Sequence, residues 1–196
     1  MTDQKTKRRI GLLGGSFNPA HEGHVHISEL SLDLLGLDEV WWLVSPQNPL
    51  KGLSDMATLD DRVANAKAVV KDFSAIKISD VERKLGTRYT VDTLTALKTQ
   101  HTDCDFVWIM GADNLRQMVK WKGWRTIFRT LPIAVFPRAP YSLRALSGRA
   151  AKCFSGAQIP SASAKKLVDL QAPAWVFLKA PTHEQSATRI RRRFAL

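Results

Sequence analysis

The stretch GGSFNPAHEGHVH at positions 14–26 gathers residue types that can bind phosphate and stabilise negative charge. It directly follows the apolar run RIGLL. Gly14 and Gly15 carry no Cβ, so a ligand can approach their backbone closely. A helix that begins after them would present unpaired N–H groups and the positive end of its dipole to an anion. We therefore expect a strand-to-helix turn that holds the phosphates of a nucleotide.

Two histidines in this stretch have a spacing that suits catalysis. His21 and His24 are three residues apart, so they would face the same way on one helical turn. Two imidazoles directed at one point can donate hydrogen bonds to developing negative charge. Two other interpretations stay open: a lone histidine can simply cap a helix, and His21, His24 and His26 could chelate a transition metal. The spacing of these histidines is not His-Glu-x-x-His, and no carboxylate or thiolate is an obvious further ligand. We therefore predict no metal site formed by the protein.

Several well-known nucleotide-binding and redox classes are not supported by the sequence. Neither Gly-x-Gly-x-x-Gly nor the P-loop pattern occurs, which disfavours a dinucleotide dehydrogenase and a P-loop ATPase. The run IGLL is too short for a signal peptide or a membrane span. The two cysteines have no metal-ligand spacing and fit a reducing compartment. We therefore expect a soluble, cytoplasmic protein without a membrane partner.

The elements that would position the two histidines alternate along the chain. We expect strands at RIGLL, EVWWLV, AIKIS, DFVWIM, LPIAVF and AWVFL. Helices are expected over 22–35, ended by Gly36, over 59–72, over TVDTLTALKTQ with Thr90 or a neighbour as N-cap, and over the last ten residues. The segment 138–166 is expected to be a long connection with one or two helical turns. This alternation predicts an α/β fold, a Rossmann-like doubly wound parallel sheet with helices on both faces.

Size and charge restrict the possible organisation and partners. The 196 residues suit one domain, 1–196, whose basic residues 1–8 are expected to form a flexible N-terminus. Lysine and arginine number 29 against 18 acidic residues, a formal charge of +11. Such a balance favours anionic partners, namely nucleic acid, anionic lipid or phosphorylated small molecules.

Four polar clusters follow predicted strands: 14–24, 45–51, 111–114 and 183–191. Ligands of doubly wound folds bind at the carboxyl ends of the strands, so we expect these clusters to meet in one site. In the third cluster, Asp113 could accept hydrogen bonds from ribose hydroxyls or cap a helix, and Gly111 would leave room for a ligand. In the fourth, Ser186 or Thr188 could cap a helix that binds phosphate, with Arg191 as a cation, or the segment could be a solvated basic tail.

The stretch GGSFNPAHEGH resembles the Gly-x-Phe-[Asp/Asn]-Pro-x-His-x-Gly-His signature of the nucleotidyltransferase superfamily, with His21-Glu22-Gly23-His24 as its HxGH core. Within that superfamily the chain resembles the bacterial nicotinate-nucleotide adenylyltransferases. The stretches LDEVWWLVSPQNPLK, RYTVDTL, GADNLRQMVKWKGWRTI and SATRIRRR carry this resemblance in the expected order. The loop NPLK departs from the usual Pro-Pro-His-[Lys/Arg] pattern, since it keeps the terminal cation but lacks the histidine.

The resemblance implies a role for each matching position. The catalytic residues would be His21, His24 and Arg191. The ATP-binding residues would be Gly14, Gly15, Ser16, Phe17, Gly111, Asp113, Ser186 and Thr188. The residues that bind the nicotinate nucleotide would be Lys51, Tyr89, Thr90 and Trp121, the last by stacking on the pyridine ring.

The implied reaction transfers AMP from ATP to nicotinate mononucleotide, giving deamido-NAD and pyrophosphate in NAD biosynthesis, with Mg²⁺ carried mainly by the phosphates. The attacking phosphate is already an anion, so no general base is needed. The alternatives are adenylylation of nicotinamide mononucleotide or phosphopantetheine and, from a different class, a small basic RNA-binding protein. The expected partners are ATP and nicotinate mononucleotide, without a stable nucleic-acid partner, and a homo-oligomer stays open.

Overall fold

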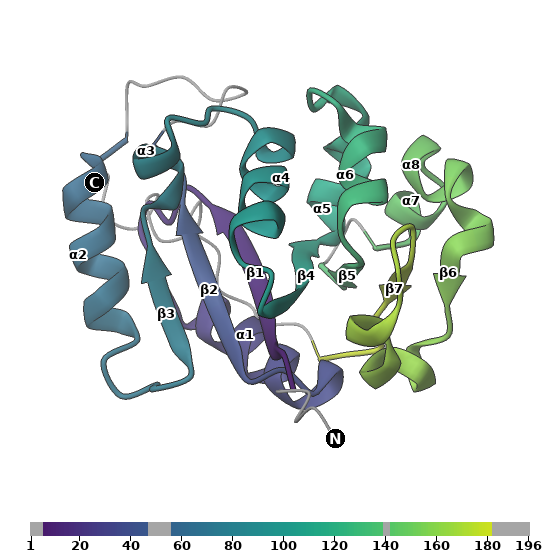
Figure 1. The fold of residues 1–196 in the computed structure, drawn as a ribbon, viewed down its shortest axis with the longest axis horizontal. Helices are drawn as coiled ribbons and strands as arrows, with labels where there is room; N and C mark the ends of the chain where they lie inside the picture. Colours follow the sequence, from purple (N-terminus) through teal and green to yellow (C-terminus); the bar gives the residue numbers. More distant parts are fainter. Residues whose placement is uncertain (1–5, 47–55, 139–141, 182–196) are drawn as a thin grey trace.

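The computed structural model describes residues 6–46, 56–138 and 142–181 (Figure 1). Their strands form one seven-stranded sheet in the order β3-β2-β1-β4-β5-β7-β6, with each neighbouring pair parallel. The strands are β1 (Arg8–Gly15), β2 (Glu39–Val44), β3 (Ile76–Ser79), β4 (Cys104–Gly111), β5 (Ile133–Phe136), β6 (Gln158–Ile159) and β7 (Trp175–Phe177). All six predicted strands are present, and the prediction of a doubly wound parallel sheet is confirmed.

Helices cover both faces of this sheet. Successive side chains of a strand point to opposite faces, so each buried strand contributes apolar residues to both. On β4, Phe106 and Trp108 enter one core cluster, and Val107 and Ile109 enter the other. The first cluster packs under α4 (Thr90–Gln100), α5 (Ala112–Gln117), η1 (Met118–Lys120), α6 (Trp124–Thr130), α7 (Ser142–Leu146) and α8 (Arg149–Cys153). The second packs under α1 (Glu22–Leu35), α2 (Leu59–Val69) and η3 (Ser161–Asp169).

The order of the strands decides where a ligand can bind. From β1 the chain continues outward through β2 and β3 on one side, and β4 and β5 lie on the other side. Because the strands are parallel, their carboxyl ends share one edge, which β1, β2 and β3 reach at their arrowheads in Figure 1. The residues after β1 and β4 therefore flank the point where the strand order reverses, the usual ligand site of such sheets.

Several predicted boundaries need correction. Arg8 already belongs to β1, so the flexible N-terminus predicted for residues 1–8 ends before this position. The helix predicted over 59–72 ends at Val69. The N-cap of α4 is Tyr89, a neighbour of Thr90 as the prediction allowed, and it makes no side-chain capping bond. The predicted helix over the last ten residues lies outside the described residues.

Two regions contain more structure than the sequence suggested. The short helix α3 (Val81–Leu85), which ends at Gly86 in the left-handed conformation, was not predicted. The segment expected to be a connection holds α7, α8, the 3₁₀ turn η2 (Ser155–Ala157), the two-residue strand β6 and the 3₁₀ helix η3. Except for the nine-residue η3, these elements have two to five residues, which is too short for a sequence pattern to reveal them.

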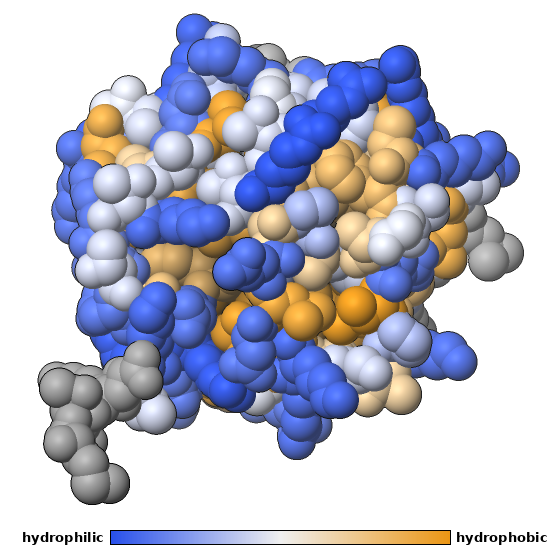
Figure 2. Space-filling model, turned by 45° about the vertical axis from the view of Figure 1, so that its right-hand side comes forward, coloured by the Kyte–Doolittle hydropathy of each residue, from blue (hydrophilic) through white to orange (hydrophobic). Residues whose placement is uncertain are grey.

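The surface carries no large exposed apolar side chain among the described residues except Leu170, which is 38% exposed. The face shown in Figure 2 has patches of hydrophobic residues between long hydrophilic ones, so these patches come from partly buried residues. In the described ranges, none of the helices combines the length and apolar character needed to cross a bilayer.

Candidate active site

The turn between β1 and α1 consists of residues 16–21, which we call the first turn. Gly14 and Gly15 are the last two residues of β1 and pair with Leu43 and Val44 of β2. The turn therefore begins at Ser16, two residues later than predicted. Its backbone lies at the carboxyl edge of the sheet, next to the reversal of strand order.

Two glycines of the predicted ATP site have protein atoms close to where a Cβ would lie. A Cβ on Gly14 would lie 2.3 Å from Cη2 of Trp108, so the indole fills that space. A Cβ on Gly111 would lie 2.5 Å from Oδ1 of Asp113. Protein atoms therefore occupy the space that each missing side chain leaves, and the role of both glycines in binding ATP stays a prediction.

The two histidines form a reciprocal cap at the start of α1. His21 is the N-cap, and its Nδ1 accepts a hydrogen bond of 3.1 Å from the backbone N–H of Gly23. Nδ1 of His24 accepts a bond of 3.2 Å from the backbone N–H of His21. The two ring centroids lie 3.9 Å apart. The histidines are adjacent as predicted, but they do not share one helical turn, because His21 precedes the helix in an extended conformation.

This cap fixes the tautomer of both rings. A neutral imidazole nitrogen that accepts a hydrogen bond carries no proton, so in His21 and His24 the proton sits on Nε2. Burial lowers the pKa of His24 to about 3, and the neighbouring His21 and Arg138 lower it further. His24 is therefore neutral at physiological pH and offers Nε2–H as a donor.

Phe17 supports the histidines from within the core. Its ring is 2% exposed, stacks on Trp42 at 4.9 Å and contacts the ring of His24 at 4.7 Å. Its φ of 45° lies in the left-handed region, which is uncommon for a residue with a side chain. Any contact of Phe17 with ATP would thus involve its backbone, since the ring packs inside the protein.

Asp113 lies after β4, in the first turn of α5. Gly111 is the N-cap of α5 and no side chain caps it, so the alternative of a cap by Asp113 is wrong. Oδ2 of Asp113 accepts a hydrogen bond of 3.2 Å from Nη1 of Arg138. Oδ1 is buried and has no hydrogen-bond partner among the described residues. A buried carboxylate oxygen without a partner is costly, so this position suits a ligand that brings a donor such as a hydroxyl.

The start of α4 carries a positive charge from a neighbouring element. Tyr89 is an uncapped N-cap, and Nζ of Lys122 lies 4.4 Å from the centroid of its ring. The same Nζ pairs with Asp92 at 3.5 Å. An uncapped helix start beside an ammonium group attracts an anion such as a carboxylate. Thr90, the first residue of this helix, is part of the same arrangement.

Trp121 lies next to Lys122, between η1 and α6. It has an extended backbone and packs, half-buried, against the first core cluster. Trp124 is 9% exposed, begins α6 and contacts Phe154 edge-on at 6.1 Å. Only Trp124 is helical, so the two tryptophans do not share a helical face.

Comparisons with known proteins agree with this arrangement. The family model described as cytidylyltransferase-like matches residues 12–193. A protein of Parvibaculum lavamentivorans named "probable nicotinate-nucleotide adenylyltransferase" is 52% identical over 94% of this chain and 92% of its own length. A protein of Methylorubrum extorquens with the same name is 48% identical over 94% of this chain and all of its own length. The chain belongs to the cytidylyltransferase-like family, in the branch of the nicotinate-nucleotide adenylyltransferases.

The same fold occurs in a distant, solved adenylyltransferase. The structure of Plasmodium falciparum nicotinic acid mononucleotide adenylyltransferase complexed with NaAD matches with a TM-score of 0.70 at 16% identity. The match covers 94% of this chain and 83% of that one. At this identity the likeness concerns the fold of the adenylyltransferase family.

Four predicted site residues of this adenylyltransferase lie outside the described residues: Lys51, Ser186, Thr188 and Arg191. The described part brings together His21, the last residue of the first turn, and His24 of α1, and it places Asp113 next to Arg138. Arg138 in turn lies close enough to His24 to lower its pKa.

Three cations near this site were missed by the sequence analysis: Arg62, Lys122 and Arg138. Arg138 could have been noticed, because it follows β5 at the same edge as the other clusters. Arg62 occupies the apolar stripe of α2 between Leu59 and Ala66, and it is 2% exposed. A charged residue on a buried helix face signals a structural or functional role. Its burial lowers the pKa of the guanidinium, which stays protonated at neutral pH.

One group of possible metal ligands lies elsewhere in the described part of the chain. A nitrogen of His101, a carboxylate oxygen of Asp103 and Sγ of Cys104 lie within 4.8 Å of one another. Cys104 starts β4, so the group is at the amino edge of the sheet, opposite the first turn. Nη2 of Arg8 already lies 3.4 Å from Sγ of Cys104 and 3.6 Å from Oδ2 of Asp103, so a guanidinium holds these groups.

Proposed function

We propose that the chain transfers the adenylyl group of ATP to nicotinate mononucleotide, forming deamido-NAD and pyrophosphate. The observation that carries this proposal is the reciprocal cap of His21 and His24, which turns both rings into Nε2–H donors at the start of α1. Family membership supports it, since both curated relatives are named for this activity.

The proposed chemistry needs charge stabilisation more than proton transfer. The phosphate of nicotinate mononucleotide attacks the α-phosphorus of ATP and the bond to the β-phosphate breaks, so pyrophosphate leaves with the electron pair. The nucleophile is already an anion, and the site needs no general base. His24 is neutral, so it would donate a hydrogen bond to the phosphate oxygens while keeping its proton. The first turn and Arg138 would hold the reacting phosphates in line.

Two groups of the described residues would hold the two substrates. Asp113 would accept a hydroxyl of the adenosine through its unpaired Oδ1. The uncapped start of α4 at Tyr89 and Thr90 would meet the carboxylate of nicotinate, with Lys122 adding positive charge. Trp121, which is half-buried beside them, would stack on the pyridine ring.

Mg²⁺ would enter as part of the ATP substrate. The imidazoles of His21 and His24 are a poor donor set for Mg²⁺, which prefers oxygen ligands and retains several waters. The ion would supply further charge neutralisation on the phosphates.

The test is pyrophosphate release from ATP and Mg²⁺ with different acceptors. We expect deamido-NAD from nicotinate mononucleotide and a kcat/KM at least about tenfold lower with nicotinamide mononucleotide, because a neutral amide cannot use the charge of Lys122. Turnover of phosphopantetheine but not of nicotinate mononucleotide would contradict the proposal. Tight, steeply salt-dependent RNA binding without ATP turnover would contradict it in favour of an RNA-binding protein.

A further inference from the structure

The first turn is attached to α2, which lies next to it at the same edge of the sheet. Two hydrogen bonds connect them: Ser16 O accepts from Arg62 Nη1 at 2.7 Å, and Ala20 N donates to Asn65 Oδ1 at 3.0 Å. A third joins the turn to the residues just before α2, since Asn18 Oδ1 accepts from Ala57 N at 3.3 Å. Ser16 and Ala20 are thus bonded to the side chains of Arg62 and Asn65, which lie one helical turn apart on α2.

Arg62 bonds to three further carbonyl groups. Besides Ser16, its guanidinium donates to the carbonyl oxygens of Ser45 at 2.7 Å, Pro46 at 3.0 Å and Ala57 at 3.0 Å. The side chain is 2% exposed. One buried, planar group therefore joins the turn after β1, the residues after β2 and the residues before α2.

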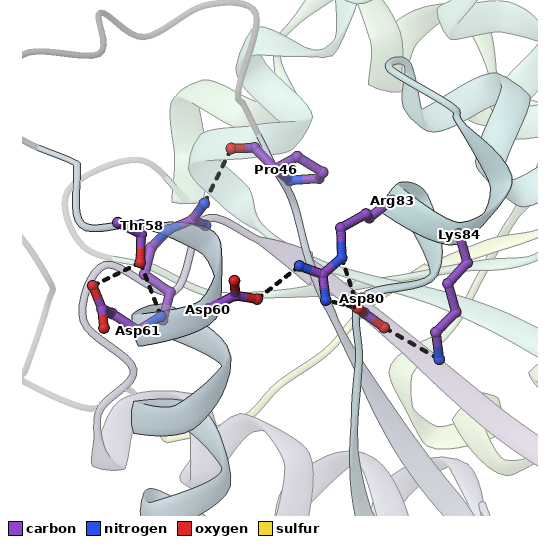
Figure 3. A network of polar contacts seen from close by, with 8 residues as sticks. Pro46, Thr58, Asp60, Asp61, Asp80, Arg83 and Lys84 are labelled. Atoms are coloured by element: carbon purple, nitrogen blue, oxygen red, sulfur yellow. Dashed lines mark hydrogen bonds and ion pairs between the residues drawn. The ribbon is translucent and has the colours of Figure 1, made fainter.

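The helix that carries Arg62 is itself fixed. Thr58 caps α2 by accepting from the N–H of Asp61 at 3.1 Å. Arg83 of α3 donates to Asp60 of α2 at 2.7 Å and also contacts Asp80, as Figure 3 shows. The same view shows the carbonyl of Pro46, which accepts from Arg62. Because α2 is held by the cap of Thr58 and by Arg83, the contacts of Arg62 determine the position of the first turn.

We propose that Arg62 is a positioning residue for adenylyl transfer, which holds the carbonyl of Ser16 and with it the first turn and the cap of His21 and His24. At 2% exposure Arg62 acts through the backbone and does not touch substrate. This inference rests on the proposed function, because it assumes that the phosphates bind at the first turn. A displacement of about 1 Å in such a site costs roughly 10²-fold in rate.

The test compares Arg62→Lys and Arg62→Met with Arg9→Met, a control that removes an arginine paired with Asp169 at the other end of β1. A lysine keeps the charge but cannot supply the planar fork that reaches four carbonyls. We expect kcat to fall about 10- to 100-fold in Arg62→Lys at a temperature where it is fully folded, with KM for nicotinate mononucleotide changed less than threefold. Arg9→Met should keep the kcat of the wild type.

Hydrogen exchange provides a readout that does not depend on activity. In Arg62→Lys, backbone amides of residues 16–24 should exchange at least about tenfold faster, while those of β4 and β5 keep their protection. Should Arg62→Met fail to fold, Asn65→Ala removes the second attachment alone and should lower kcat about threefold with faster exchange over the same residues.

Two results would overturn the inference. The first is a folded Arg62→Lys variant with kcat within twofold of the wild type, and the second is exchange that accelerates equally across the sheet. A wild-type chain that does not adenylylate nicotinate mononucleotide refutes the proposed function instead, whereas the exchange experiment still decides whether Arg62 holds the first turn.

Discussion

Replacing His24 by asparagine separates the two roles that the structure gives this side chain. Nδ1 of His24 accepts the N–H of His21, and Nε2 is the donor that would face the phosphates. An asparagine keeps an acceptor oxygen near the position of Nδ1 but ends before Nε2. The capping bond should survive, whereas the donor is lost.

The expected magnitudes differ for the two roles. Loss of one donor to developing negative charge lowers kcat about 10²- to 10³-fold. His24→Ala loses the donor and also the cap, which costs a further ~1 kcal/mol in the free energy of unfolding. His24→Gln reaches further and can present an amide N–H, so it should recover part of the activity that His24→Asn lacks.

Initial rates of pyrophosphate release at saturating ATP and nicotinate mononucleotide measure the loss of kcat. Urea unfolding measures the loss in the free energy of unfolding. The predicted order of kcat is wild type, then His24→Gln, then His24→Asn and His24→Ala together. A His24→Asn variant with kcat within about fivefold of the wild type would refute the donor role of Nε2, because the loss of a donor should cost far more.

Three further predictions follow from the described contacts. Because the pKa of His24 is about 3 when folded against 6.5 when unfolded, the unfolded chain binds more protons, and the free energy of unfolding should fall by about 2 kcal/mol from pH ~8 to pH ~5. Urea titrations in which His24→Asn shows the same slope would contradict this. Gly14→Ala places a Cβ 2.3 Å from the ring of Trp108 and should cost about 1–3 kcal/mol in thermal unfolding, whereas Gly156→Ala, with no atom within 4 Å, should be nearly neutral. Lys122→Met should lower the preference for nicotinate over nicotinamide mononucleotide about fivefold in kcat/KM ratios, as expected for a partly exposed charge worth ~1 kcal/mol, and an unchanged ratio would remove Lys122 from acceptor selection.

The sheet and the histidine pair could be predicted because their signals are local. Apolar runs of four to six residues bounded by polar turns mark the buried strands, and the residues from Gly14 to His24 are contiguous. The reciprocal cap also depends on neighbours in sequence, since His21 and His24 are three residues apart. Parallel topology then brought the ends of β1 and β4 to one edge.

The contacts that complete the site connect distant parts of the chain. Arg62 is 46 residues from Ser16 and Arg138 is 25 residues from Asp113, so no local pattern reports either pair.

The glycines illustrate a second limit. The sequence shows that Gly14 and Gly111 lack a Cβ, but only the fold reveals that Trp108 and Asp113 fill those spaces.

The central claim is that the first turn and the neutral imidazoles of His21 and His24 hold the phosphates during adenylyl transfer. A crystal structure of the chain with a non-hydrolysable ATP analogue and nicotinate mononucleotide tests this directly. The account predicts phosphate oxygens within hydrogen-bond distance of Nε2 of His24 and of backbone N–H groups of residues 16–21. A triphosphate bound away from that turn, with Nε2 of His24 bonded to a protein acceptor, would contradict it.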